Sequence, residues 1–313
     1  MSSRELIKKM LSGDKAALAR VITLVENRSN GHLALMAEIQ KHCGQATTIG
    51  VTGPPGSGKS TLVDKLTKNL RAEGKKIGIV AIDPSSPFSG GAVLGDRIRM
   101  QDHATDEAVF IRSLGSRGSR GGLSRATREV VKLYDAFGMD IVIVETVGVG
   151  QTELDIMEVA DTTLVVLTPE SGDTIQTMKA GILEIADIFV VNKADRDGAG
   201  QIQAELMAML QLGEETKKRG EAPSGGTPWK PPVLLVQATK EIGIGELLQE
   251  IRRHEKSRSG PEKGKKRKAL FQEEAREILL DELRPRLQRR MNKEGVWENP
   301  YELVAKILAK INL

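Results

Sequence analysis

Short apolar segments alternate with longer segments of helical periodicity from residue 47 onward. The apolar segments are almost free of charge, which is typical of strands buried on both faces of a sheet. They are Thr47–Thr52, Ile77–Ile82, Ala108–Ile111, Ile141–Val144, Thr163–Leu167, Ile188–Val191 and Val233–Val236. This alternation predicts an α/β fold with a mostly parallel central sheet flanked by helices, in which ligands bind at the carboxyl ends of the strands.

The first 45 residues show helical periodicity and no segment with strand character. Leu18, Val21, Ile22 and Val25 recur at helical spacing after Asp14, which can cap the helix. The N-terminal sequence lacks the apolar core of a signal peptide, so we expect it to belong to the folded protein.

The second half of the chain contains two segments that favour irregular structure. Gly213–Pro232 is rich in glycine, proline and charge and predicts a surface loop. Lys256–Lys268 predicts a basic linker, followed by a helix at Ala269–Leu283, which Pro285 ends or kinks. A last amphipathic helix is expected at Glu302–Ile311. We therefore expect a helical N-terminal extension over residues 1–45, an α/β domain over 46–255 and a helical C-terminal extension over 256–313.

The amino-acid composition argues against several classes of function. The 313 residues include a single cysteine, Cys43, which excludes an intramolecular disulfide and fits a reducing cytoplasm. No apolar run approaches the roughly 18 residues of a membrane span. Aromatic residues make up 3% and the net charge is +4, so neither base stacking nor charge indicates a nucleic-acid-binding protein. The basic run Lys263–Lys268 is interpreted as solvated.

A phosphate-binding loop follows the first predicted strand. The sequence Gly53-Pro54-Pro55-Gly56-Ser57-Gly58-Lys59-Ser60, continued by Thr61, matches the pattern G-x-x-x-x-G-K-[ST]. Backbone N–H groups of such a loop and the positive end of the next helix bind phosphate oxygens. We expect Lys59 to contact the β- and γ-phosphates and the Ser60 hydroxyl to bind Mg²⁺.

The end of the sixth predicted strand indicates which base is bound. Asn192-Lys193-Ala194-Asp195 resembles the Asn-Lys-x-Asp signature of GTPases. The Asp195 carboxylate can accept hydrogen bonds from N1–H and the exocyclic amine of guanine, whereas adenine offers no N1–H. The stem of Lys193 can cover the base. Gln237-Ala238-Thr239 resembles the remaining base-contact loop, although Ser-Ala-Lys is commoner there.

Acidic residues near the expected γ-phosphate position are candidates for a magnesium site. Asp83 and Glu145 end two predicted strands, and Asp96 lies in the loop after Asp83. Ras-like proteins have Asp-x-x-Gly where this chain has Glu145-Thr146-Val147-Gly148, so two modes of metal contact remain open for Glu145, a direct one and one through water. Each of these acids can alternatively be a solvated carboxylate.

The segment after Glu145 predicts slow hydrolysis. Gly148 is expected to approach the γ-phosphate through its N–H. Ras-like proteins place a water-orienting glutamine directly after this glycine, whereas this chain has Val149, and its nearest glutamine is Gln151. The arginines of Arg112–Arg128 form either a solvated basic loop or an anion-binding surface.

Taken together, these segments resemble MeaB/ArgK-type P-loop GTPases, which are relatives of the hydrogenase nickel-insertion and urease accessory GTPases. The resemblance covers the whole α/β domain. It is carried by the sequences GPPGSGKST, AIDPSSPFSGGAVLGDRIRM, ETVGVGQTE, LTPESGDTIQTMKAGI and NKAD.

The resemblance implies a homodimeric GTPase that acts as a chaperone for an adenosylcobalamin-dependent acyl-CoA mutase, usually methylmalonyl-CoA mutase. Such a chaperone gates cofactor loading and protects the mutase from inactivation. The resemblance also implies that Asp83, Asp96 and Glu145 serve the magnesium site with Ser60. The loop Pro169–Lys179 would be an additional switch, in which Lys179 is the candidate for coupling to the mutase.

Three other functions remain open at this point. A kinase would need an acceptor base and a substrate pocket, and the sequence shows a signature of neither. A nickel metallochaperone would need clustered soft ligands, for which the pair His42-Cys43 is the one hint. A binding module that holds GTP without hydrolysing it is the third.

Overall fold

A computed structural model describes residues 2–83, 103, 105–115, 125–146, 155–171, 184–218, 229–258, 261–293 and 299–309. The chain divides into two compact units, Met1–Ser257 and Arg258–Leu313.

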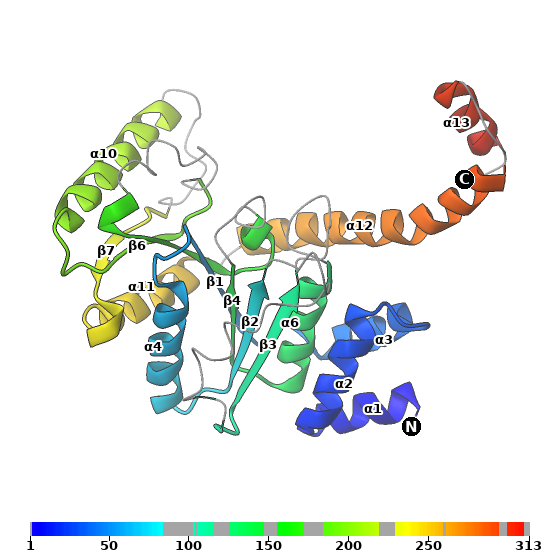
Figure 1. Cartoon of the computed structure of the whole chain (residues 1–313), viewed down its shortest axis with the longest axis horizontal. Coiled ribbons are helices and arrows are strands. Elements are labelled where there is room, and N and C mark those ends of the chain that lie inside the picture. Colours follow the sequence, from blue (N-terminus) through cyan, green and yellow to red (C-terminus); the bar gives the residue numbers. More distant parts are fainter. Residues whose placement is uncertain are drawn as a thin grey trace. The chain divides into compact units, whose positions relative to one another are not determined.

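The first unit is built on a parallel sheet (Figure 1). Its strands are β1 Thr47–Thr52, β2 Ile77–Asp83, β3 Val109–Gly115, β4 Ile141–Glu145, β5 Thr162–Leu167, β6 Ile188–Asn192 and β7 Val233–Val236. The described residues form one seven-stranded sheet in the order β3-β2-β4-β1-β5-β6-β7. All of its neighbouring strands pair in parallel. The predicted α/β fold is confirmed, and every predicted strand is present.

The strands are buried on both faces because their apolar side chains alternate between two hydrophobic clusters. In β5, Leu164 and Val166 pack into one cluster, whereas Val165 and Leu167 pack into the other. The same alternation occurs in β2, β4 and β6. Because both faces of such a strand are buried, neither face carries a row of solvent-exposed polar side chains. The strand segments of the sequence are therefore largely apolar.

Helices cover the two faces of the sheet (Figure 1). On one face lie α4 Lys59–Ala72 and α11 Ile244–Ser257. On the other face lie α6 Arg125–Phe137 and α10 Ala199–Lys218. Short 3₁₀ turns complete the unit: η1 Gln40–His42, η3 Ile156–Glu158, η4 Pro169–Ser171 and η5 Ala238–Lys240.

The N-terminal residues form three helices, α1 Ser3–Leu11, α2 Lys15–Glu26 and α3 His32–Ile39. The predicted cap is present, because Asp14 accepts a hydrogen bond from the Ala17 N–H at 3.0 Å. Leu18 and Ile22 of α2 are fully buried and belong to the same hydrophobic cluster as α6 and one face of the sheet. The N-terminal helices therefore share the core of the α/β unit.

The second unit contains α12 Pro261–Lys293 and α13 Pro300–Ala309. The basic linker predicted up to Lys268 is wrong from Pro261 onward, because this segment is helical. Proline is tolerated at the first position of a helix, and lysine and arginine favour the helical conformation. The helix also continues past Pro285, whose carbonyl accepts a hydrogen bond from Arg289 Nε at 3.3 Å. The predicted end of the helix before Pro285 is therefore wrong.

The surface loop predicted from Gly213 onward is wrong as far as Lys218, because α10 continues to that residue. Glutamate and lysine residues after Gly213 compensate for the low helix propensity of glycine. Among the described helices, none is long and apolar enough to cross a membrane.

Candidate functional site

The phosphate loop connects β1 to α4 at the carboxyl edge of the sheet. Gly53 and Gly58 both have positive φ angles, 141° and 86°. A β-carbon on Gly53 would lie 2.1 Å from the carbonyl oxygen of Val166, and one on Gly58 would lie 2.3 Å from Nδ2 of Asn192. These two positions therefore require glycine both for their backbone conformation and for the space they leave to β5 and β6.

Lys59 is the first residue of α4 and is buried, with 6% of its surface exposed. Its Nζ donates hydrogen bonds to the carbonyl oxygens of Gly53 at 2.9 Å and Pro54 at 3.0 Å. The ammonium group is thus held inside the curve of the loop, where a bound phosphate chain would meet it.

Ser60 lies next to Glu145 at the end of β4. The Ser60 hydroxyl donates a hydrogen bond to Oε1 of Glu145 at 2.6 Å, and both residues are buried. Glu145 is fixed by its strand, because it pairs with Val51 of β1 and with Ala81 of β2. Hydroxyl and carboxylate oxygens are ligands that suit Mg²⁺, so the donor set fits this metal.

The other residues predicted for this region are described only in part. Asp83 ends β2 two residues beyond Ala81, the residue that pairs with Glu145, so its backbone lies at the same edge of the sheet. Asp96 and Gly148 lie outside the described residues, as does Lys179. Thr146 is described and buried, and its hydroxyl donates to that of Thr52 at 2.9 Å, which ties the end of β4 to β1.

Asn192 joins the phosphate loop to the predicted base loops. Its Nδ2 donates to the carbonyl oxygen of Ser57 at 2.8 Å, and its Oδ1 accepts from the N–H of Ala238 at 3.1 Å. One buried amide therefore connects three segments that are far apart in the sequence. The sequence motif indicated this residue, but it gave no sign of these two contacts.

The rest of the Asn-Lys-x-Asp motif forms a turn at the end of β6. Lys193 adopts a positive φ of 57°, and its carbonyl accepts from the Arg196 N–H at 3.0 Å. Ala194 N–H donates to the carbonyl of Val236 at 3.1 Å, which places the turn beside the end of β7. Asp195 is exposed, as a base-contacting carboxylate in an accessible site must be.

The loop Gln237-Ala238-Thr239 follows β7 directly. Gln237 and Ile242 exchange two backbone hydrogen bonds, of 3.1 and 3.2 Å, which close the loop. Ala238 is buried beneath it and starts η5. The structure therefore brings this loop and Asn192 together, as the sequence motifs predict.

Glu170 lies in the loop Pro169–Lys179 that is predicted as an additional switch, and its contact with the guanine motif was not predicted. It lies in η4, three residues after β5 ends, and its carboxylate contacts Arg196 Nη1 and lies 4.0 Å from Lys193 Nζ. No sequence signal could reveal this contact, because acidic residues after a strand are common in surface loops.

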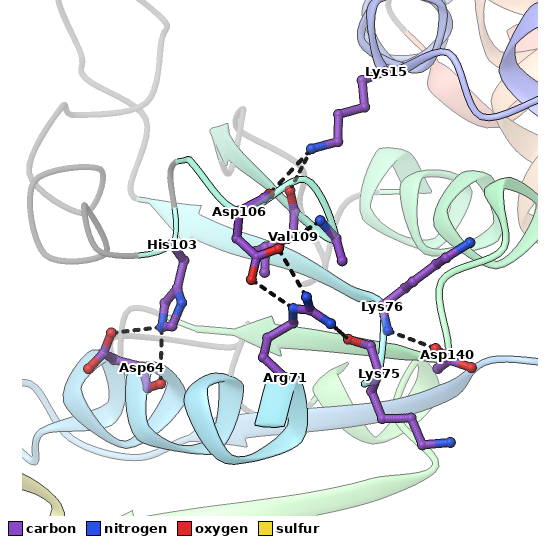
Figure 2. A network of polar contacts seen from close by, with 10 residues as sticks. Lys15, Asp64, Arg71, Lys75, Lys76, His103, Asp106, Val109 and Asp140 are labelled. Carbon is purple, nitrogen blue, oxygen red and sulfur yellow. Dashed lines mark hydrogen bonds and ion pairs between the residues drawn. The ribbon is translucent and has the colours of Figure 1, made fainter. Parts of the chain in front are cut away.

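A polar network anchors the turn before β3 to α4 and α2 (Figure 2). Arg71 of α4 donates to both carboxylate oxygens of Asp106, at 2.8 and 3.2 Å. The hydrogen bond from Arg71, together with one from the Ala108 N–H, holds the pKa of Asp106 below its usual value. Lys15 of α2 donates to the carbonyls of Asp106 and Val109. The network thus links the N-terminal helices to the helix that follows the phosphate loop.

His103 forms a second contact with α4 in the same view (Figure 2). Its Nε2 lies 3.0 Å from Oδ1 of Asp64, one turn after the phosphate loop. In the sequence, His103 is the first described residue after the segment that contains Asp96.

The arginines of the segment Arg112–Arg128 are partly described. Three of them form ion pairs within the protein: Arg112 with Glu26, Arg125 with Glu129, and Arg128 with Glu158. Arg125 is buried and also contacts His32 Nε2 at 2.8 Å. The charges of these three arginines are therefore compensated by carboxylates within the protein. Arg117 and Arg120 lie outside the described residues.

The pair His42-Cys43, considered above as a possible nickel site, has no support as a metal site in the described part of the chain. Within it, no group of three or more His, Cys, Asp or Glu side chains could hold a metal ion. The Cys43 thiol donates to the carbonyls of Ile39 and Lys132, both at 3.3 Å, so it packs between η1 and α6.

Comparison with protein families identifies the chain. Residues 18–292 match the family described as methylmalonyl-CoA mutase-associated GTPase MeaB. This chain belongs to the MeaB family. The matched range includes the phosphate loop, Glu145 and the Asn-Lys-x-Asp motif, so the resemblance seen in the sequence is confirmed.

Individual relatives support this assignment. A putative GTPase of Pyrococcus abyssi is 51% identical over 271 residues, which cover 86% of this chain and 82% of the relative. GTPase ArgK of Escherichia coli is 40% identical over 252 residues, which cover 79% and 74%. A solved structure described as LAO/AO transport system kinase superposes with a TM-score of 0.66 at 28% identity, covering 99% of this chain and 98% of that one.

The family and the relatives establish the reaction class. The chain is a GTPase that binds GTP and GDP. Its family is associated by name with methylmalonyl-CoA mutase. The phosphate loop and the guanine motif lie at one edge of the sheet, as this reaction requires.

Proposed function

We propose that this GTPase is a chaperone of an adenosylcobalamin-dependent acyl-CoA mutase of the methylmalonyl-CoA mutase type. It gates the loading of the cofactor and protects the mutase from inactivation. The proposal rests on one structural observation in a chain of the MeaB family. The buried side chain of Asn192 joins the phosphate loop to the base loops by two hydrogen bonds. These two hydrogen bonds preorganise the site for a nucleotide, and the family name links the chain to the mutase.

The nucleotide is held by residues of three segments. The proposed phosphate contacts come from the backbone of Gly53 to Ser60 and from Lys59, whose charge offsets the negative charge that develops on the phosphates. The proposed guanine contacts come from Asn192, Lys193 and Asp195, together with the loop Gln237 to Thr239. Asp195 selects guanine by accepting from two of its N–H donors.

The proposed magnesium site uses Ser60, Asp83, Asp96 and Glu145. The hydrogen bond between Ser60 and Glu145 supports it, because it places two oxygen ligands side by side next to the phosphate loop. Mg²⁺ would neutralise charge on the β- and γ-phosphates. The role of the protein is to fix these oxygens before the nucleotide arrives, and Glu145 is well suited because its strand is paired on both sides.

Intrinsic hydrolysis is expected to be slow. The backbone N–H of Gly148 is proposed to contact the γ-phosphate, but Val149 stands where Ras-like proteins have a water-orienting glutamine. A partner that supplies the missing water-orienting group would complete the site. We infer that the mutase is this partner.

Steady-state phosphate release across a titration of each cobalamin-dependent mutase of the source organism tests the proposal. The cognate mutase should raise the rate, and each tenfold rise corresponds to about 1.4 kcal/mol of transition-state stabilisation. If no such mutase changes the rate or binds in either nucleotide state, the chaperone assignment fails and the GTPase has another client.

We also propose that the protein is a homodimer that associates through its C-terminal helices. Exposed apolar side chains on α12 support this, namely Phe271, Leu279 and Leu280, with exposed fractions of 65%, 59% and 51%. A second copy would bury them. Light scattering should report a dimer that Leu280→Asp dissociates, whereas the exposed neighbour change Gln272→Glu should leave it intact.

A further inference from the structure

The guanine motif receives support from a carboxylate that lies outside it. Glu170 belongs to η4, which follows β5, whereas Lys193 and Arg196 follow β6. One oxygen of Glu170 contacts the Arg196 guanidinium, and the other lies 4.0 Å from the Lys193 ammonium. A single side chain therefore spans two cations of the base loop.

The backbone of the motif is already fixed without Glu170. The hydrogen bonds from Arg196 N–H to the Lys193 carbonyl and from Ala194 N–H to Val236 define the turn. The positive φ of Lys193 is a conformation that non-glycine residues rarely adopt, and it sets the direction in which the side chain leaves the turn. The four-carbon stem beyond that point stays flexible unless something holds its end.

Glu170 supplies this restraint from a second segment. η4 packs against the beginning of α10, the helix that follows the guanine motif. The Lys193 side chain is 31% exposed and that of Glu170 is 48% exposed, so the pair is screened only in part. We infer that Glu170 is a positioning residue for base binding, which orders the Lys193 stem over the guanine ring.

This inference rests on the proposed role of Lys193 at the base. It adds a source of base affinity that lies outside the Asn-Lys-x-Asp tetrapeptide. It also makes base affinity depend on the position of η4, because the carboxylate moves with that turn.

Nucleotide affinity and steady-state kinetics of the full chain test the inference. Glu170→Gln keeps an acceptor for Arg196 but removes the charge that attracts Lys193. We expect about a threefold rise in the Kd of GDP at low salt, which shrinks at high salt because a partly exposed pair is screened. The KM for GTP should rise by more than kcat changes. Glu205→Gln, the same change at an exposed position of α10, should alter neither.

The route through Lys193 is tested by combining variants. Glu170→Gln should have no further effect on GDP affinity in a Lys193→Ala background. In the parent protein, Glu170→Gln should weaken the binding of GDP and of inosine diphosphate by the same factor, because this change leaves the contacts of Asp195 with the base edge unaltered.

The failures can be told apart. If Lys193→Ala weakens GDP binding but Glu170→Gln does not, or acts equally in both backgrounds, the inference is overturned and the proposed base site stands. If Lys193→Ala leaves GDP affinity unchanged, the proposed role of Lys193 at the base fails and the inference fails with it, whereas the role of Asp195 is tested separately.

Discussion

The Ser60 hydroxyl and the Glu145 carboxylate are joined by a 2.6 Å hydrogen bond across the boundary between α4 and β4. The two residues are 85 positions apart in the sequence. The bond aligns the second residue of the helix after the phosphate loop with the last residue of a central strand. Two buried oxygens thus lie together where the β- and γ-phosphates are expected.

Removal of the Ser60 hydroxyl or of the Glu145 charge should lower the apparent affinity for Mg²⁺ in GTP hydrolysis. Glu145→Gln keeps the shape of the side chain but removes its charge, and Ser60→Ala removes the hydroxyl. We expect the apparent Mg²⁺ affinity in GTP hydrolysis to fall at least about tenfold in either variant, since even outer partners of metal ligands contribute 10- to 100-fold. Titration of Mg²⁺ at saturating GTP measures this. Glu246→Gln, an exposed change on α11, serves as the control, and an unchanged Mg²⁺ titration in both variants would remove the pair from the metal site.

Lys59→Ala should suppress hydrolysis by at least about 100-fold, the usual effect of removing one preorganised group that stabilises transition-state charge. The ammonium group is held by the carbonyls of Gly53 and Pro54, so its position does not depend on a flexible stem. Single-turnover phosphate release gives the rate of the chemical step. Lys75→Ala, at an exposed position after α4, should retain the parent rate. Parent-like hydrolysis in Lys59→Ala would exclude the phosphate loop from the mechanism.

Asp195→Asn should shift base preference from guanine toward xanthine. The amide can donate to the additional carbonyl of xanthine but cannot accept from both N–H donors of guanine. Because a hydrogen bond to a charged group contributes about 1.5–3 kcal/mol, GTP affinity should fall by about 10- to 100-fold while xanthosine triphosphate gains. Competition binding with both nucleotides measures the shift, with Asp197→Asn in the same exposed turn as control. Equal affinity of the parent protein for ATP and GTP would refute the base assignment.

The ion pair between Arg71 and Asp106 should stabilise the fold in a pH-dependent way. The pKa of Asp106 is lower in the folded state, first because Arg71 donates to it and then because the Ala108 N–H does. Its contribution is therefore fully present above the unfolded pKa of about 3.9 and is lost as the pH falls through the lower folded value. Asp106→Asn should reduce the free energy of unfolding by about 1 kcal/mol at pH 7 and by less below pH 3.

Urea unfolding at several pH values measures this difference. Glu107→Gln, the exposed neighbour, should leave the free energy of unfolding unchanged. A deficit in Asp106→Asn that is the same at pH 7 and at pH 3 would mean that the charge of Asp106 does not stabilise the fold.

Much of the fold could be predicted because the strands carry a strong local signal. Thr47–Thr52 and Val233–Val236 coincide with β1 and β7, since short runs without charged residues fit a sheet that is covered on both faces. The C-terminal helix was harder to predict. The charged segment Pro261–Lys268 has the composition of a linker, but its lysines and arginines are also good helix formers.

The motifs identified the chemical groups of the site but not the contacts between them. Lys59 and Asp195 follow from local patterns, because phosphate loops and guanine turns are short and contiguous. The contact between Asn192 and Ser57 spans 135 positions and depends on the order of the strands. The pair of Glu170 with Lys193 depends in addition on the path of a surface turn, which residue types alone do not define.

The bridge through Asn192 also fixes the distance over which a ligand must reach. The phosphate loop and the base loops are attached to the same buried amide, so a longer or shorter ligand could separate them only by breaking one of its hydrogen bonds. A guanine base and a diphosphate offered as separate molecules would each have only half of the site's contacts. Their covalent connection through the ribose makes the second contact intramolecular, with an effective concentration that can reach the millimolar range. In the proposed site, the strength of GDP binding is therefore as much a property of this span as of the individual contacts at its two ends.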